Sequence, residues 1–592
     1  MKLIPRINIT DAISKKWRNS RYIVSSGKLL MIAMIIGVLG GLGAVLFHNA
    51  LEYTTDLVIG KLSGFPEADL SGVIPLIPKW LFFLVPTVGG LLSGILVYTF
   101  APEAEGHGTD AMIDSFHNKG GKVRTRVPFI KAIASIITIG TGGSAGYEGP
   151  TAQIGSGFGS IISKLLKVPE KMGRLLLLAG TAAGLGAIFR APLGGALTSV
   201  EVIYKEDFES EGFLPCIVAS VVAYATFMQV TGAVGALFDL PGLSYNHTYE
   251  LVFFAIFGVL CAPVSWLFVK SFYFTIATFR KFKIPNHFKP AIGGLGVGLI
   301  AYICPQAIGG GWQYLHDAIS GEFTILFLLV IAGLKIVTTS LTVGSGGSGG
   351  VFGPSLFIGG MLGGFFGYGL DFLFPHMISN PAAYVLVGMG AFFAGAANAP
   401  IASIIMVCEI TGNYALLAPL MLASIIHIML AKRWSIYKNQ KANKFDSPAH
   451  QDEMNTDVLR SIQIGSIVPR QHQVVTVHQY EHLSELKWLI GETEVETYPV
   501  LDDNGRIVGL LSLHQLRQVI LETSAQHLVI VEDMMTEVFS LRKSFDLHFA
   551  SQIFLRSKHT ELPVVDEEGN IQGLLKYQDI LMAYDEYLDK LD

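Results

Sequence analysis

One carboxylate in a glycine-rich stretch has the surroundings most able to do chemistry in this sequence. Glu148 lies in Gly-Tyr-Glu-Gly-Pro at residues 146–150, inside a glycine-rich run over 140–159 with apolar segments on both sides. Glycine lets the backbone approach closely, and proline at position 150 suits the first turn of a helix. We therefore predict a loop that opens a helix, whose free N–H groups and dipole attract anions. Glu148 is then an anion built into an anion site, which indicates a gate.

Glycine-rich stretches have two simpler roles in other proteins, binding of phosphate and close packing of helices. A phosphate-binding loop would end in Gly-Lys-Ser/Thr, and residues 140–159 contain no such ending. Glycines also allow close packing between helices in lipid, and this role stays open for the stretch taken alone. An ionisable residue deep in a membrane segment is nevertheless a functional candidate by default.

A second glycine-rich loop mirrors the first. Gly-Val-Phe-Gly-Pro at 350–354 repeats the spacing of 146–150, and each loop follows a Gly/Ser-rich run. Arg-Ala-Pro-Leu at 190–193 is likewise mirrored by Asn-Ala-Pro-Ile at 398–401. Interruptions in corresponding places of two halves are typical of an inverted-repeat transporter whose site lies near the membrane midplane.

The elements around these loops are long apolar segments. The 592-residue chain is 51% hydrophobic and 15% charged, against about 25% charged residues in soluble domains. We find no HExxH motif and no aspartate pair in the apolar segments, so we predict no enzyme. The cysteines lack metal-like spacing, which predicts neither a disulfide framework nor a zinc site; they are Cys216, Cys261, Cys304 and Cys408. The apolar runs lie near 29–47, 81–100, 127–139, 174–203, 213–233, 250–275, 289–303, 323–340, 350–374, 382–408 and 414–431.

Basic residues flank the apolar part on both sides. Residues 1–28 are polar and basic, and Lys432, Arg433 and Lys438 follow the last apolar run. The positive-inside rule places both flanks in the cytoplasm. We therefore expect a cytoplasmic segment over 1–28, a membrane domain over 29–437 and a polar linker over 438–460.

Two similar units of roughly 60 residues complete the chain, over 461–523 and 524–592. In each, an apolar strand meets an acidic turn that ends in glycine and is followed by a second apolar strand, at 498–512 and at 562–576. This pattern predicts a β-hairpin in each unit, with a helix after it.

The paired glycine-rich loops resemble those of the CLC family of chloride channels and chloride/proton antiporters. The C-terminal repeats are similar to a pair of cystathionine-β-synthase (CBS) domains, so the resemblance covers nearly the whole chain. It implies an all-α polytopic membrane domain, an inverted repeat of about eighteen helices with several broken, followed by a cytoplasmic α/β CBS pair. It also implies a homodimer in the plasma or inner membrane, in contact with lipid, in which each subunit conducts chloride or a related small anion. No nucleic acid, metal or required cofactor is expected.

The resemblance assigns roles to particular residues. Glu148 matches the gating glutamate, which occupies an anion position when ionised and swings away when protonated or displaced. Tyr437 matches the tyrosine whose hydroxyl closes the inner side of the central anion site. Backbone amides that match those lining the anion path belong to Tyr147, Glu148, Gly149, Val351 and Phe352.

The chain departs from the family pattern at the central site. The family commonly supplies a serine hydroxyl to the anion, and His107 falls at that serine's place. An imidazole N–H can donate to chloride, and its charge can change near physiological pH. The alternative is that His107 points elsewhere and that only backbone amides coordinate the anion.

A second departure concerns proton coupling. Antiporters of the family generally carry an inward-facing glutamate where this chain has Val202, and Glu201 lies about 100° away around the helix. Valine therefore favours a passive chloride channel gated by Glu148, with chloride/proton antiport as the alternative. A membrane sensor that signals through the CBS pair is a remote alternative. A third departure is Tyr147, which stands where an arginine is common and so leaves one favourable charge near the outer mouth missing.

The CBS pair carries two incomplete nucleotide motifs. Adenine-nucleotide binders of this type usually combine a hydroxyl with an acid three residues later. The first unit keeps the hydroxyl at Ser512, and the second keeps the acid at Asp579. Nucleotide binding and a purely structural or dimer-stabilising role both stay open.

Overall fold

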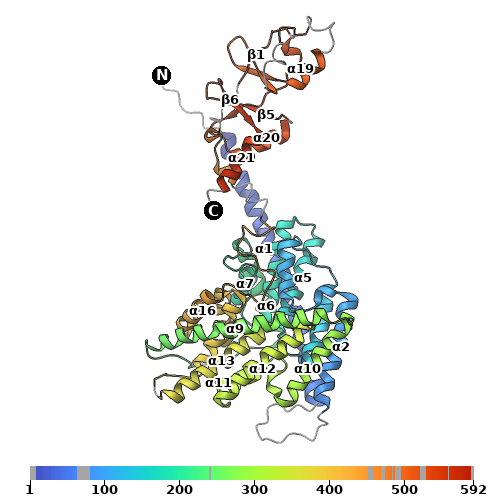
Figure 1. The fold of residues 1–592 in the computed structure, drawn as a ribbon, viewed down its shortest axis with the longest axis vertical. Helices are drawn as coiled ribbons and strands as arrows, with labels where there is room; N and C mark the ends of the chain where they lie inside the picture. The colour runs from blue at the N-terminus through green and yellow to red at the C-terminus, as the bar shows by residue number, and fades with distance from the viewer. Residues whose placement is uncertain are drawn as a thin grey trace. The chain divides into compact units, whose positions relative to one another are not determined.

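The chain forms two compact units, Met1–Ala449 and His450–Asp592. A computed structural model describes residues 9–62, 80–238, 242–375, 377–450, 458–467, 474–482, 484–486, 495–520, 529–557 and 559–588. The first unit is helical and the second holds two small sheets (Figure 1). Parts of the expected N-terminal segment, linker and first CBS unit, such as residues 1–8, 451–457 and 487–494, lie outside the described residues.

Helices of very unequal length make up the first unit. Seven of the described helices are long and apolar enough to cross a membrane, while others have only 8 to 15 residues. The short ones break where the sequence places glycine and proline, as the motifs predict. The helices are α1 (Ile9–Thr55), α2 (Leu81–Phe100), α3 (Thr109–Asn118), α4 (Val127–Gly140), α5 (Glu148–Leu165), α6 (Glu170–Ile188), α7 (Pro192–Glu201), α8 (Ser210–Thr231), α9 (Glu250–Lys281), α10 (Lys289–Ile303), α11 (Trp312–Ile319), α12 (Ile325–Gly344), α13 (Phe352–Leu373), α14 (Ala383–Ala397), α15 (Pro400–Thr411) and α16 (Leu417–Ala431).

The same packing order appears in both halves of this unit. In the first half α5 packs on α6, and α6 packs on the short helix α7. In the second half α13 packs on α14, and α14 packs on the short helix α15. Contacts of α2 with α10 and of α7 with α15 join the halves. The repeat that the mirrored motifs predicted is therefore present in the fold.

Glycine sets how closely these helices approach. A Cβ on Gly155 of α5 would lie 2.1 Å from the Gly180 carbonyl oxygen of α6. The equivalent pair in the second half behaves alike, because a Cβ on Gly359 would lie 2.2 Å from the Gly388 carbonyl oxygen. Close packing by small residues is thus one real role of the glycines, alongside the loops that carry the site.

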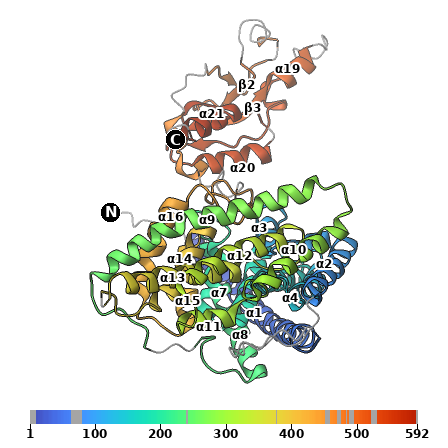
Figure 2. The same cartoon turned by 60° about the horizontal axis from the view of Figure 1, so that its bottom comes forward.

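The long helix α9 runs along one edge of the unit, where it packs on α16, α14 and α12 (Figure 2). With 32 residues it is about 48 Å long at 1.5 Å per residue, which exceeds the hydrocarbon thickness of about 30 Å. It must therefore tilt or extend beyond the hydrocarbon layer.

Both predicted hairpins of the second unit are present. β2 (Thr497–Leu501) pairs antiparallel with β3 (Ile507–Ser512), and β5 (Glu561–Val565) pairs in the same way with β6 (Ile571–Lys576). A short parallel strand completes each sheet, β1 (Val477–His478) or β4 (Leu541–Arg542). The remaining described helices are α19 (Leu513–Ile520), α20 (Leu547–Ser557) and α21 (Tyr577–Leu588).

The acidic turns of the hairpins are built alike. Asp502 accepts hydrogen bonds from the backbone N–H groups of Asn504 and Arg506, and Asp566 accepts from those of Glu568 and Asn570. These bonds favour the ionised carboxylates and lower the pKa of both aspartates.

Candidate anion pathway and gate

The two glycine-rich loops meet inside the first unit, Met1–Ala449, which is called the membrane unit below. Gly146 N–H donates to the Gly350 carbonyl oxygen (2.8 Å), and Gly350 N–H donates back to the Gly146 carbonyl oxygen (2.6 Å). Such reciprocal bonding is what a local two-fold axis between repeats produces. It brings the N-termini of α5 and α13, which begin at Glu148 and Phe352, to the same place. Two helix N-termini that converge make a region favourable to anions.

The Glu148 side chain reaches across to the other repeat. Its Oε2 accepts a hydrogen bond from Gly353 N–H (3.2 Å), in the first turn of α13, and the residue is 1% exposed. Its Oε1 has no hydrogen-bond partner among the described residues. The carboxylate thus lies where a free anion would be attracted, as the gate hypothesis requires.

Two glycines make room for this carboxylate. A Cβ on Gly146 would lie 1.8 Å from Glu148 Oε2, and one on Gly353 would lie 2.6 Å from Oε1. The sequence reasoning named the amides of Val351 and Phe352 and missed that of Gly353. The position of Gly353 inside the mirrored Gly-X-X-Gly-Pro motif, two residues after Val351, could have indicated that its amide also faces the site.

Aromatic rings surround the start of both helices. The Tyr147 ring stacks on Trp312 (centroids 5.9 Å apart), and Phe352 packs against Phe189 at 5.0 Å and Phe393 at 4.3 Å. The amides of Tyr147 and Phe352 therefore lie at apolar walls next to Glu148. Trp312 opens α11 and was not anticipated from the sequence.

His107 and Tyr437 lie together on another side of the site. Their ring centroids are 5.4 Å apart, and Asp110 N–H donates to His107 Nδ1 (3.4 Å). An accepting Nδ1 leaves the proton of a neutral imidazole on Nε2. His107 also borders a cavity of about 640 Å³ that reaches the polar residues Lys438 and Asn439.

The loop that carries His107 packs directly on the start of α5. A Cβ on Gly149 would lie 2.0 Å from the His107 carbonyl oxygen, so Gly149 and His107 touch through their backbones. The structure thus brings the predicted residues Glu148, Gly149, His107 and Tyr437 into one neighbourhood. Their roles in anion binding stay predictions.

Two buried lysines hold the loops next to this site in the same way in both repeats. Lys131 of α4 donates to the carbonyl oxygens of Ala104 (3.0 Å) and Gly106 (2.7 Å). Lys335 of α12 donates to those of Ile308 (3.3 Å) and Gly309 (2.7 Å). Both lysines are 0% exposed, so each holds its loop from inside the protein, beside the pathway.

Val202 and Glu201 have different surroundings. Val202 directly follows α7 and is 1% exposed. Glu201 turns to α15, where it accepts from the N–H groups of Ile401 (3.1 Å) and Ala402 (2.6 Å). Glu201 therefore satisfies the N-terminus of α15 and holds two helices together.

Glu409 of α15 returns this contact. It accepts from the N–H groups of Leu193 (3.2 Å) and Gly194 (2.6 Å) at the start of α7. Each short helix therefore supplies the carboxylate that satisfies the N-terminus of the other.

Comparison with known families agrees with this geometry. The family described as voltage gated chloride channel matches residues 89–432, and the CBS domain matches residues 464–522 and 530–586. The chain belongs to the CLC chloride channel family. It is an integral membrane CLC protein with a C-terminal CBS pair, as the resemblance implied.

Relatives extend the match over most of the CLC domain. The chain is 31% identical over 413 residues to MJ0305 of Methanocaldococcus jannaschii, covering 69% of this chain and 95% of that protein. It is 30% identical over 411 residues to the H(+)/Cl(-) exchange transporter ClcA of Salmonella paratyphi B, covering 68% and 85%. A slow cyanobacterial Cl-/H+ antiporter shares the fold with a TM-score of 0.62 at 24% identity, covering 68% of this chain and 94% of that one.

The predicted nucleotide residues lie at different places in the two CBS units, because Ser512 ends β3 whereas Asp579 lies in the first turn of α21. Ser512 ends β3 and its hydroxyl donates to Gln515 Oε1 (3.0 Å). Asp579 follows β6 and accepts from Lys576 N–H (2.9 Å). Lys576, where the motif expects a hydroxyl, forms an ion pair with Glu561 (3.1 Å). The nucleotide role of Ser512 and Asp579 stays a prediction.

Proposed function

We propose that this CLC protein exchanges chloride for protons, with Glu148 as the group shared by both ions. The sequence favoured a passive channel because of Val202, with antiport as the alternative. The observation that carries the proposal is the 30% identity over 411 residues to a protein named H(+)/Cl(-) exchange transporter. The position of the Glu148 carboxylate on the α13 N-terminus supports it, because the same group can bind a proton.

The mechanism follows from competition for one position. When ionised, the Glu148 carboxylate holds the Gly353 N–H and excludes a chloride from the α13 N-terminus. When protonated, it is a weaker acceptor, so it leaves and a chloride takes its place. Each return of the carboxylate then displaces an anion and releases a proton, which links the two movements.

Passive chloride conduction is the second candidate, and Val202 is the observation that favours it. Valine at 202 cannot carry a proton, and Glu201 beside it is bound to two backbone N–H groups of α15. In an exchanger, protons would therefore reach Glu148 by another way, for which the cavity bordered by His107 offers space.

Reversal potentials of the purified full-length protein in planar bilayers separate these candidates. Under symmetric chloride with a pH gradient, exchange predicts a reversal potential that shifts with the gradient. Glu148→Gln should retain chloride current and fix the potential at zero. A wild-type potential at zero would overturn exchange and support the channel, and absence of chloride-dependent current would overturn both.

We also propose that the protein is a homodimer with its N-terminus and CBS pair in the cytoplasm of the plasma or inner membrane. The basic residues around 432–438 and before residue 29 support this orientation. A thermal shift of the full-length protein with millimolar ATP tests the CBS pair. A shift that Asp579→Asn abolishes supports nucleotide binding, and no shift supports a structural role.

A further inference from the structure

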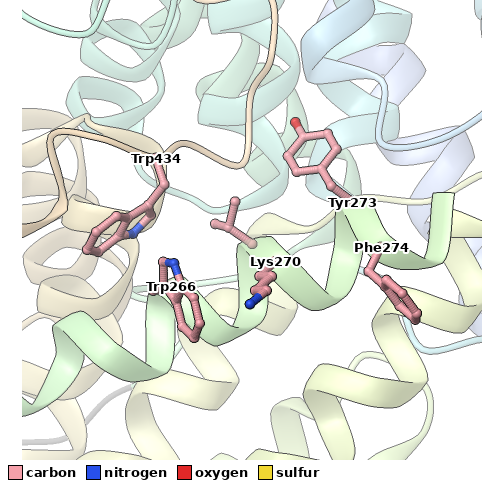
Figure 3. Close-up of a pocket in the computed structure, with 6 residues that line it drawn as sticks. Trp266, Lys270, Tyr273, Phe274 and Trp434 are labelled. Carbon is pink, nitrogen blue, oxygen red and sulfur yellow. The ribbon is translucent and has the colours of Figure 1, made fainter. Parts of the chain in front are cut away.

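A pocket of about 450 Å³ lies between α9 and the segment after α16 (Figure 3). Apolar and aromatic side chains form most of its wall, and one lysine lies among them. The residues are Trp266, Val269, Lys270, Tyr273 and Phe274 of α9, with Trp434.

Lys270 is an isolated cation on an apolar face. Its neighbours one helical turn away, Trp266, Leu267 and Phe274, are 44%, 50% and 70% exposed. The Lys270 Nζ lies 4.4 Å from the centroid of the Trp266 ring (Figure 3). Lys270 forms no ion pair with any described residue. An ammonium group at a lipid-facing surface needs a counter-charge or access to the headgroup layer.

Hydrogen bonds tie this part of α9 to the basic end of the membrane unit. Trp434 Nε1 donates to Ser265 Oγ (3.2 Å), and Tyr273 OH donates to the Ile436 carbonyl oxygen (2.9 Å). The exposed Arg433 directly precedes Trp434. Indole rings beside cations are typical of the level of lipid headgroups, so we expect the pocket to open at that level.

We propose that this pocket binds the headgroup of an acidic phospholipid. The lipid phosphate would supply the counter-charge that Lys270 lacks, and the Trp266 indole N–H would donate to a phosphate oxygen. Exposed Phe274 and Leu267 would contact the acyl chains. The charge pattern favours a lipid over a protein segment, because the wall offers a cation and apolar surface but no carboxylate.

The site also has a way to act on transport. Ile436, which accepts from Tyr273, directly precedes Tyr437. A lipid that fixes Tyr273 and Trp434 would therefore fix the segment that carries Tyr437 beside His107. This effect does not depend on whether chloride movement is coupled to protons.

Tryptophan quenching tests the proposal with the full-length protein in vesicles. One vesicle series contains phosphatidylcholine with a small fraction of brominated phosphatidylglycerol, and the other contains the same fraction of brominated phosphatidylcholine. The pocket signal is the difference between wild type and Trp266→Phe. We expect phosphatidylglycerol to be enriched about fivefold at Trp266, the factor that corresponds to ~1 kcal/mol for one cation near an acidic surface. Lys270→Gln should bring the enrichment close to one.

The matched control is Lys281→Gln, which removes an exposed lysine from the last turn of the same helix. It should leave the enrichment unchanged. Equal quenching by both lipids in the wild type would overturn the proposal, as would an equal loss in both lysine variants. Absence of quenching by either lipid would also overturn it, because a protein segment or a second copy of the chain would then cover the pocket.

Discussion

Replacing Glu148 by glutamine removes the negative charge from the α13 N-terminus while keeping the size of the side chain. The carboxylate is 1% exposed and accepts from Gly353 N–H at 3.2 Å. A hydrogen bond to a buried charge contributes about 1.5 kcal/mol at its weak end, and a partly buried helix N-terminus adds up to ~2 kcal/mol. About 3 kcal/mol therefore holds the ionised carboxylate at the α13 N-terminus, and a chloride must displace it to bind there. Without it, chloride should bind at this position about a hundredfold more tightly.

Isothermal titration of the purified protein with chloride, in a buffer whose anion is too large for the site, measures this change. Glu201→Gln is the matched control, because Glu201 is also a buried carboxylate at a helix N-terminus, that of α15, but lies outside the proposed path. Chloride affinity should rise in Glu148→Gln and stay the same in Glu201→Gln. An unchanged affinity in Glu148→Gln, or an equal rise in both variants, would refute the competition between carboxylate and chloride.

Three further outcomes are expected. Glu201→Ala should lower the free energy of unfolding by about 3 kcal/mol, because it leaves the N–H groups of Ile401 and Ala402, the second of them buried, without an acceptor. Thermal unfolding in detergent should show a smaller loss for Glu201→Gln, and equal losses would contradict this. His107→Ala should change the chloride-to-nitrate permeability ratio; if this ratio stays unchanged, His107 does not contribute to the site. The lowered pKa of Asp566 stabilises the second unit above pH ~4, so its stability should fall on acidification through the folded-state pKa. Asp566→Asn should flatten that part of a plot of stability against pH, and an unchanged plot would contradict the role of the turn.

The sequence predicted the parts of the fold that local chemistry determines. Proline at N1 of α7 and α15 and the acidic turns of the two hairpins specify their elements without distant partners. The mirrored loops also predicted a repeat, because the same residue types recur with the same spacing. The packing of equivalent helices confirms that prediction.

Contacts between distant residues lay beyond such reasoning. The acceptor role of Glu409 toward Leu193 and Gly194 depends on how two helices from different halves cross, which no local pattern records. The same holds for the Trp312 ring beside Tyr147, since α11 lies far from α5 in the sequence. The orientation of His107 toward Tyr437 likewise required the structure.

The exchange of carboxylates between α7 and α15 has a consequence for synthesis of the chain. Glu201 precedes its partner Ile401 by 200 residues. At roughly 5–20 residues per second, that segment takes about 10–40 s to emerge from a ribosome. During this interval the Glu201 carboxylate lacks its two donors on α15, and two N–H groups of α7 lack their acceptor Glu409. The membrane around them offers little water in their place. The helix N-termini of the two halves are therefore satisfied only after Glu409 has been synthesised, and a chain that ends before Glu409 leaves the α7 N–H groups without their carboxylate.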